Sequence, residues 1–157
     1  MNKKYFGIHR EGWKFFIVFS FFSLFSLLFS SFFFFIFIFL SVFTLWFFRD
    51  PERYFESQDN QLLSAADGKI VFIGNARPPE ETNISYTMKK VSIFMNVFNV
   101  HINRSPIKGN IEKIIYKNGK FFNASFDKAS EYNERNSFII NNGEDKFVVV
   151  QIAGLIA

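Results

Sequence analysis

One long uncharged stretch dominates the pattern of hydrophobic and polar positions along the chain. From Phe15 to Phe48, 34 residues contain no charged side chain, no Pro and no Gly, and 16 of the 26 Phe lie there. About 18 consecutive apolar residues already suggest a transmembrane helix, and helices of globular proteins seldom exceed about 20 residues. The pattern therefore predicts a helical membrane anchor over residues 15–48.

The predicted anchor is longer than one membrane crossing requires. A straight helix of its 34 residues would be about 51 Å long, while the hydrocarbon core is about 30 Å thick and needs about 20 residues. A hairpin of two short spans that turns near Ser30 and Ser31 uses this length better. A single tilted span with an outside domain and a shallow hairpin in one leaflet are the alternatives.

Beyond Pro51 the pattern changes to short runs of β-forming residues separated by turn signals, which is typical of an antiparallel β domain. The clearest turn signals are Asp67-Gly68 and the Asn-Asn-Gly-Glu-Asp sequence at 141–145. The expected strands cover residues 69–73, 91–95, 97–103, 107–116, 137–140 and 146–152. The predicted fold class is a mostly β soluble domain of antiparallel sheets with an N-terminal hydrophobic helical membrane anchor.

Charge divides the chain into a basic N-terminal segment (1–14), the anchor (15–48) and a β-rich domain (49–157). Residues 1–14 carry a net charge of +3, and residues 49–157 carry only +1. The excess cations thus lie beside the anchor, which favours the cytoplasmic side of a membrane and argues against a nucleic-acid partner. We expect the protein in the inner membrane of the cell, with the β-rich domain on the cytoplasmic side.

Few residues qualify as catalytic groups. The chain has two His and no Cys, and its scattered carboxylates lack the spacing of metal ligands, so no metal site is predicted. If residues 97–103 form a strand, Asn99, His101 and Asn103 share one face and form the wall of a site. The alternative is the exposed polar face of an edge strand. Asp67, at a tight turn, is either a site residue or a turn Asp that bonds its own backbone.

Five segments, taken in order, are more specific than any one of them alone. They are FFRDPER at 47–53, AADGK at 65–69, FMNVFNVHINRSP at 94–106, NASFDKASEYNERN at 123–136 and VVQIAG at 149–154. Together they resemble the phosphatidylserine decarboxylase family in its short bacterial and archaeal form. The resemblance extends over nearly the whole chain, so it implies a fold and a chemistry for all of it.

The resemblance implies a proenzyme that cuts itself at a Gly-Ser bond and converts the Ser into a pyruvoyl group. In the family this pyruvoyl group is the cofactor that accepts electrons while phosphatidylserine loses carbon dioxide and becomes phosphatidylethanolamine. The implied partners are a membrane phospholipid substrate and the small pyruvoyl-bearing chain from the same proenzyme. A homodimer is also compatible with the family.

The same resemblance assigns roles to individual residues. Asp67 would orient or activate a partner during self-cleavage, and His101 would transfer protons or position the substrate. Arg104 stands where the longer form of the family has a second His, so the role of that His is not carried over. A guanidinium suits both a carboxylate and a phosphate, so Arg104, together with Asn103, is instead a candidate to bind the serine carboxylate or the phosphate. Arg49 and Arg53 are weaker candidates for headgroup contacts, because they also form an ordinary charge cluster beside the anchor.

The sequence departs from the family at the self-cleavage site, on which the chemistry of the family depends. None of the eight Gly is followed by Ser, and the apolar end of the chain, with Gln151 as its last polar residue, suggests an unfinished domain. We therefore expect a truncated decarboxylase that is inactive as this chain alone. The alternatives are a catalytically dead membrane protein that binds acidic phospholipid headgroups and a decarboxylase of an archaeal serine ether phospholipid.

Overall fold

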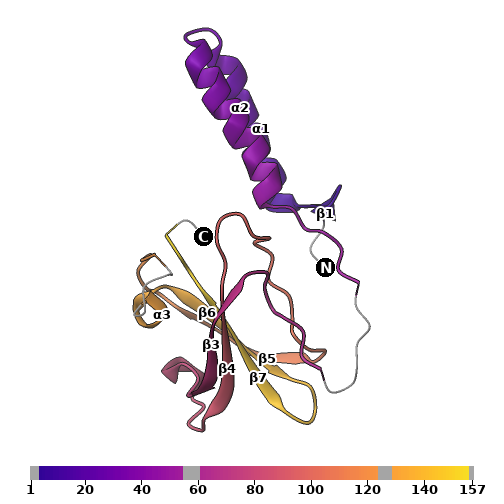
Figure 1. Ribbon diagram of the computed structural model, residues 1–157, viewed down its shortest axis with the longest axis vertical. Coiled ribbons are helices and arrows are strands. Elements are labelled where there is room, and N and C mark those ends of the chain that lie inside the picture. The colour runs from indigo at the N-terminus through magenta and orange to yellow at the C-terminus, as the bar shows by residue number, and fades with distance from the viewer. Residues whose placement is uncertain (1–3, 55–60, 124–128, 156–157) are drawn as a thin grey trace. The chain divides into compact units, whose positions relative to one another are not determined.

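The described part of the chain, residues 4–54, 61–123 and 129–155, falls into two units in this computed structural model (Figure 1). The helical unit contains the described residues up to 54 and also residues 98–102. The β unit contains the other described residues. Residues 98–102 therefore belong to the helical unit, although they lie far from both helices in the sequence.

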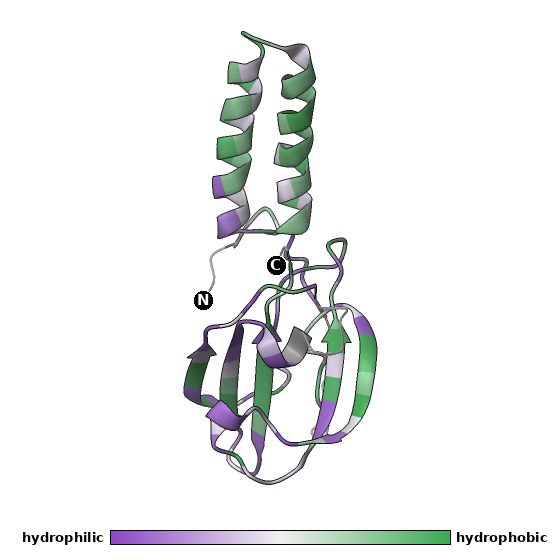
Figure 2. Ribbon diagram, turned by 90° about the vertical axis from the view of Figure 1, so that its left-hand side faces the viewer, coloured by the Kyte–Doolittle hydropathy of each residue, from purple (hydrophilic) through white to green (hydrophobic). Residues whose placement is uncertain are grey.

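The long uncharged stretch forms two antiparallel helices, α1 (Arg10–Ser26) and α2 (Ser31–Phe47), each of 17 residues. The turn between them is closed by a hydrogen bond in which Ser30 N donates to Ser26 O over 2.8 Å. Ser30 then adopts an extended backbone with φ of −164°, which ends the first helical run before the second begins. The helices lie side by side along their length (Figure 2).

Small polar residues form the contact between the two helices. The hydroxyls of Ser20 and Ser41 lie 2.7 Å apart, and Ser23 donates to the carbonyl of Phe34 over 3.2 Å. A contact of this kind lets two backbones approach closely, because neither helix must accommodate a large side chain there. The buried helical residues are Gly12, Ser23, Ser26, Ser41 and Thr44.

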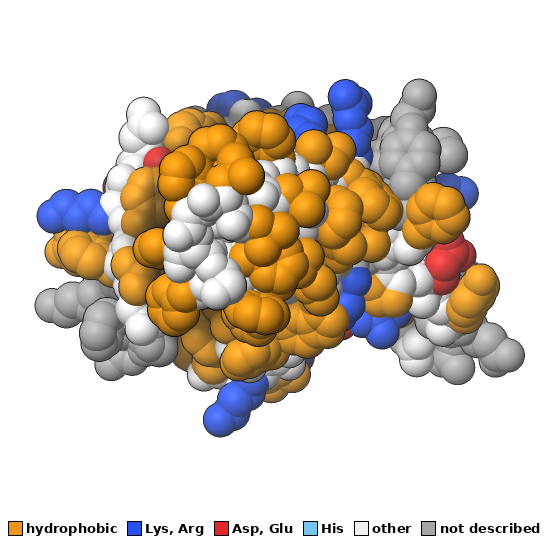
Figure 3. All heavy atoms as spheres, turned by 90° about the horizontal axis from the view of Figure 1, so that it is seen from above, with side chains coloured by type: hydrophobic (Ala, Val, Ile, Leu, Met, Phe, Trp, Pro, Cys, Tyr) orange, Lys and Arg blue, Asp and Glu red, His pale blue; other side chains and the backbone are white. Residues whose placement is uncertain are grey.

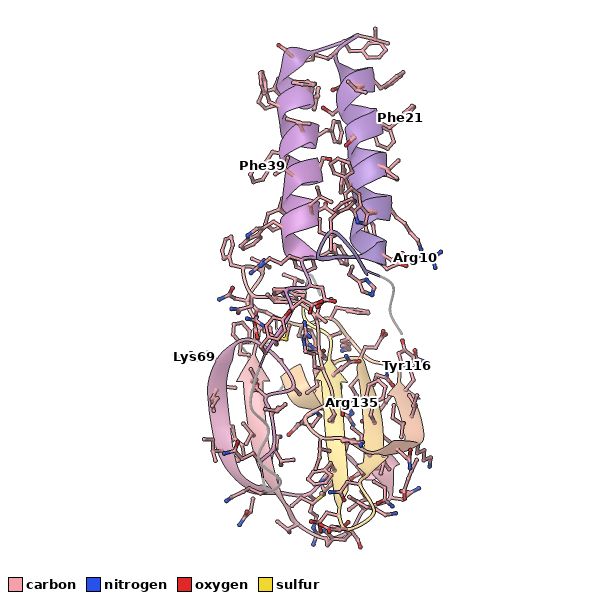
Figure 4. All side chains as sticks on the ribbon, turned by 90° about the vertical axis from the view of Figure 1, so that its right-hand side faces the viewer. Arg10, Phe21, Phe39, Lys69, Tyr116 and Arg135 are labelled. Atoms are coloured by element: carbon pink, nitrogen blue, oxygen red, sulfur yellow. The ribbon has the colours of Figure 1, made fainter. Side chains whose placement is uncertain are left out.

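Most of the Phe side chains lie on the outside of the hairpin. Phe21 is 64% exposed and Phe39 is 67% exposed, and both project away from the helix contact in Figure 4. Hydrophobic side chains likewise dominate the face of the molecule drawn in Figure 3. The hairpin thus has a small, polar interior contact and a large apolar outer surface.

The prediction of a membrane anchor over residues 15–48 was wrong. Within the residues that the structure describes, no helix has both the length and the apolar character that a membrane crossing needs. A helix of 17 residues extends about 26 Å, whereas the hydrocarbon core is about 30 Å thick. A turn near Ser30 and Ser31 was expected, and the error lies in the helices on either side of it, because each is shorter than the crossing that the sequence predicted.

The base of the hairpin is closed by a small β ribbon made of β1 (Lys4–Tyr5) and β2 (Ile8–His9). Phe6 and Gly7 between these strands have φ values of 54° and 70°, as the two central residues of a tight hairpin turn require. The ribbon is joined to the segment after α2, because His9 N donates to Phe48 O over 2.9 Å.

Two antiparallel sheets make up the β unit, as the β-rich part of the fold prediction expected. In the first, β3 (Lys69–Ala76) pairs with β4 (Met88–Phe94). In the second, β6 (Arg135–Asn141) lies between β5 (Asn110–Lys117) and β7 (Lys146–Ile152). The buried apolar side chains described in this unit, Ile139 and Ile140, both come from the central strand β6.

The connections between strands follow their local sequence. A 3-10 helix, η1 (Glu80–Thr82), lies between β3 and β4, and a one-turn helix, α3 (Ala129–Tyr132), precedes β6. The turn from β6 to β7 is held by Asn142, whose Oδ1 accepts hydrogen bonds from the backbone N–H groups of Glu144 and Asp145. Such side-chain-to-backbone bonds explain why the sequence signal for this hairpin is strong.

The strand expected over residues 97–103 does not form. Residues 97 and 98 are in a turn, and residues 100–105 have no regular secondary structure. Ring nitrogen Nδ1 of His101 bonds instead to the carbonyl of Asn99 over 3.0 Å, and Val100 is buried. The alternation that placed Asn99, His101 and Asn103 on one face therefore fails, since His101 belongs to the helical unit and Asn103 to the β unit.

Candidate functional site

The turn that carries Asp67 is held tightly against the end of β4. A Cβ atom on Gly68 would lie 2.4 Å from the carbonyl oxygen of Phe94, so no larger residue fits there without a backbone shift. On the other side of Asp67, Ser64 donates through its hydroxyl to the carbonyl of Ala66 over 2.7 Å. The half-buried Asp67 is thus held on a turn that is restrained at both of its ends.

The structure brings the segment that carries Arg104 next to the Asp67 turn. The backbone N–H of Arg104 donates to Ala65 O over 2.9 Å, and that of Leu63 donates to Pro106 O over 2.9 Å. These two bonds align residues 63–65 with residues 104–106. Two of the segments that carry the family resemblance are therefore neighbours in the β unit, and the Arg104 side chain is exposed there.

Asn103 is connected to β7 and to the residue that follows β4. Its Oδ1 accepts a hydrogen bond from Nε2 of Gln151 over 2.8 Å, and its Nδ2 lies 3.5 Å from the sulfur of Met95. Because Oδ1 accepts and Nδ2 donates, these contacts fix the orientation of the amide. Sequence reasoning did not single out Gln151, although it belongs to the segment at 149–154 that carries the resemblance.

His101 lies in the helical unit, where its ring stacks on Phe47 with the ring centroids 4.2 Å apart and the planes inclined by 23°. The imidazole is half-buried, and its Nδ1 lies 3.0 Å from the carbonyl of Asn99. A carbonyl oxygen can only accept a hydrogen bond, so Nδ1 is the protonated nitrogen in this contact and Nε2 is the nitrogen left to exchange a proton. His101 is therefore arranged to accept a proton at Nε2.

Arg49 makes its contacts within the helical unit. Its Nη2 donates to Phe98 O and its Nη1 to Trp46 O, each over 2.8 Å. The guanidinium also lies over the Trp46 ring, 4.0 Å from the ring centroid. Arg53 is exposed. The headgroup contacts expected of Arg49 and Arg53 stay a prediction, and Arg53 has the more accessible side chain.

An ion pair that sequence reasoning missed connects η1 to the central strand of the second sheet. Arg135 donates to the Glu81 carboxylate through both Nε and Nη2, and the two side chains are only 8% and 14% exposed. These hydrogen bonds lower the pKa of Glu81 from 4.5 to about 2. No local signal could have found this pair, because its members are 54 residues apart.

A buried Asn supports the region around the end of β7. Asn133 is 1% exposed, and its amide donates to Phe122 O and Ala153 O while its Oδ1 accepts from Phe122 N. These three bonds use most of the capacity of the amide. They hold the segment after β5 and the segment after β7 together.

Among residues 4–54, 61–123 and 129–155, no group of three His, Asp or Glu gathers that could hold a metal ion.

Comparisons with known proteins identify the family that the motif segments resemble. A family model described as phosphatidylserine decarboxylase matches residues 40–157. The phosphatidylserine decarboxylase proenzymes of Xanthobacter autotrophicus and Azorhizobium caulinodans are each 47% identical to this chain, over 100% of its length and 68% of theirs. That of Pelagibacter ubique is 45% identical over 96% of this chain and 71% of the relative. The chain therefore belongs to the phosphatidylserine decarboxylase family.

Proposed function

We propose that this chain supplies the larger part of a self-processing enzyme that releases carbon dioxide from phosphatidylserine and leaves phosphatidylethanolamine. The observation that carries the proposal is 47% identity to two proenzymes along the full length of this chain. The convergence of three resemblance segments in the β unit supports it, through the bonds of Arg104 to Ala65 and of Asn103 to Gln151.

The cofactor in this proposal is a pyruvoyl group, which when present withdraws electrons from the bond that breaks. In the family it forms from the Ser of a Gly-Ser bond, and none of the eight Gly in these 157 residues precedes a Ser. The small pyruvoyl-bearing chain would therefore come from the part of the proenzyme that corresponds to the uncovered portion of the relatives. The donor set of this chain suits such a group, because it offers a proton acceptor, a carboxylate and an exposed guanidinium.

His101 and Asp67 are the residues that we assign to proton handling. In self-cleavage, His101 would accept at Nε2 the hydroxyl proton of the Ser as its oxygen attacks the preceding carbonyl, since Nδ1 already donates to Asn99 O. It would return this proton to the amide nitrogen whose bond to that carbonyl breaks. Asp67 would orient or activate a partner during self-cleavage through its carboxylate. The restrained turn around Gly68 supports this role, because a carboxylate on a fixed turn loses little entropy when it binds its partner.

Substrate recognition would rest on Arg104 and Asn103. The guanidinium of Arg104 suits the carboxylate or the phosphate of the serine headgroup, and both anions can bind it through two parallel hydrogen bonds. Asn103 would present an amide whose orientation Gln151 fixes. Binding of the phospholipid headgroup by Arg53 is the weaker part of the proposal.

A completed proenzyme tests the function. The 157 residues are joined to the portion of the Xanthobacter autotrophicus proenzyme that the alignment leaves uncovered. This chimera is incubated with phosphatidylserine in detergent micelles. We expect two bands on a denaturing gel and release of carbon dioxide. His101→Ala should impair one or both, whereas His9→Ala, at the other His, serves as the matched control.

Three results of this experiment would speak against parts of the proposal. If the unmodified chimera neither cuts itself nor decarboxylates phosphatidylserine, the result favours the alternative hypothesis of a catalytically dead protein that binds phospholipid headgroups. If His101→Ala processes and decarboxylates at the unmodified rates, His101 is not part of the site. If the chimera cuts itself but, when a serine ether phospholipid is added to the micelles as a competing substrate, prefers it to the diacyl lipid, the substrate assignment is wrong.

A further inference from the structure

The end of α2 holds the segment that carries His101 through three side chains. Trp46 meets the ring of Phe98 edge to face, with centroids 5.8 Å apart. Arg49 donates to the carbonyl of the same Phe98 over 2.8 Å. Phe47 stacks on His101 itself. Residues at the end of α2 and just beyond it therefore contact a segment about fifty residues further along the chain.

These contacts restrain the imidazole in two different ways. The stack on Phe47, with a 23° inclination and a 4.2 Å separation of centroids, restrains the plane of the ring. The bond from Nδ1 to Asn99 O restrains rotation within that plane and fixes the tautomer. Neither restraint alone is sufficient, because a flat stack still permits rotation and a single hydrogen bond still permits tilting.

We propose that Phe47 is a positioning residue for His101: its ring holds the imidazole with Nε2 directed to accept the proton in self-cleavage and turnover. This inference rests on the proposed function of His101. A general base must approach its proton to within hydrogen-bond distance and in the right direction. An imidazole that lost its stack would spend much of its time in unproductive orientations.

The proposal assigns the helical hairpin a second task besides its own packing. α2 ends at Phe47, and its C-cap Phe48 returns a backbone hydrogen bond to Thr44 over 3.0 Å. The last residue of the helix thus has a fixed backbone on which to display its ring. The hydrogen bonds of Ser20 and Ser23 join α1 to α2, so Phe47 projects from a helix that its neighbour supports.

The first test uses the 157-residue chain itself and requires no catalysis. Side-chain ¹⁵N spectra at a pH where the ring is neutral should show His101 protonated at Nδ1, and nuclear Overhauser contacts should connect its ring to that of Phe47. In Phe47→Leu the ring-current shifts of the His101 protons should disappear. A wild-type His101 protonated at Nε2, or one without contacts to Phe47, would overturn the proposal.

The second test uses the completed proenzyme. Phe47→Leu should slow self-cleavage about tenfold or more, because small misplacements of a catalytic group are costly. Phe47→Tyr keeps the ring and should restore the rate to within about twofold. The matched control is Phe35→Leu, a 66% exposed position on the same helix, which lies about 18 Å earlier along its axis.

The outcomes separate the positioning role from the function on which it rests. If Phe47→Leu cleaves as fast as the unmodified chimera, or Phe47→Tyr is as slow as Phe47→Leu, Phe47 does not position His101. If Phe35→Leu is equally slow, the effect belongs to the hairpin as a whole and the proposal fails. If the unmodified chimera never cleaves, the proposed function fails, while the spectra of the chain alone still decide whether Phe47 orients the imidazole.

Discussion

The guanidinium of Arg135 donates two parallel hydrogen bonds to the carboxylate of Glu81, and both side chains are largely withdrawn from water. Lys117 adds a third charge, with its Nζ 3.8 Å from Oε2 of Glu81. The pair joins η1, in the connection of the first sheet, to β6, the central strand of the second (Figure 4 labels Arg135). It therefore connects the loop between the strands of the first sheet to the central strand of the second.

Removing the charge of Glu81 should destabilise the β unit. Glu81→Gln leaves Arg135 largely buried without a counter-charge, so we expect a loss of about 2–4 kcal/mol in the free energy of unfolding. Urea denaturation of the 157-residue chain measures it. Glu144→Gln is the control, since Glu144 is exposed in the β6–β7 turn. Equal midpoints for the two variants would show that the pair contributes no net stability.

The same ion pair predicts the response to acid. The pKa of Glu81 is about 2 in the folded chain because of its bonds to Arg135, against an ordinary value of 4.5. A carboxyl whose folded pKa is depressed adds stability that is complete above its unfolded pKa and is lost as the pH falls toward its folded pKa. We expect the stability difference between wild type and Glu81→Gln to shrink between pH 5 and pH 2. A difference that stays constant over this range would refute the assignment.

Asn133 should be sensitive to truncation because its amide makes three hydrogen bonds in a site that is 1% exposed. Asn133→Ala would leave the backbone groups of Phe122 and Ala153 without their partner, at a cost of about 3 kcal/mol. Hydrogen exchange at Phe122 N measures the effect locally. Asn118→Ala, at an exposed position, should change stability by no more than about 0.5 kcal/mol.

At Gly12, helix propensity and the local packing predict opposite changes in stability for a substitution by Ala. Helix propensity alone would make Gly12→Ala stabilising by up to about 1 kcal/mol. In the structure, however, a Cβ atom at this position would lie 2.5 Å from Cβ of Phe48, so the helix start and the segment after α2 must move apart. We expect a lower thermal midpoint for Gly12→Ala. A higher midpoint would mean that the hairpin base is looser than its geometry indicates.

The 157-residue chain also permits a direct test of the missing Gly-Ser bond. Expressed alone and incubated with phosphatidylserine, it should remain one uncut band and release no carbon dioxide, because no Gly in it precedes a Ser. Mass spectrometry of the purified chain detects cleavage at any other bond. A second band at defined mass, or measurable turnover, would contradict this expectation.

Local sequence signals located the elements that local interactions hold. The expected strand at 146–152 has the bounds of β7, and the turn before it is held by Asn142, a neighbour in sequence. The expected strand at 69–73 begins where β3 begins, after the Asp67-Gly68 turn, but β3 extends to Ala76. The end of β3 depends on its pairing with β4, which the run of β-forming residues alone does not reveal.

Features that depend on partners distant in the sequence could not be predicted from local patterns. The apolar alternation at 97–103 is compatible with a strand, yet Trp46, Phe47 and Arg49 hold this segment in an irregular conformation. For the candidate site, the resemblance pointed to Asp67, His101 and Arg104, but it could not identify the stack on Phe47. Phe47 belongs to the resemblance segment at 47–53 and His101 to the one at 94–106. The occurrence of both segments in one chain was therefore the only sequence signal that could have suggested this contact.

The contact between the end of α2 and residues 98–101 also has a consequence for the order of events on the ribosome. The hairpin is fully synthesised about fifty residues before Phe98 and His101 emerge. At typical translation speeds of about 5–20 residues per second, the aromatic end of α2 waits roughly 3–10 seconds for its partner segment. During that interval Trp46 lacks the Phe98 ring that it meets edge to face and Phe47 lacks the His101 ring on which it stacks. A chaperone that recognises exposed aromatic side chains would therefore find a target at the end of α2.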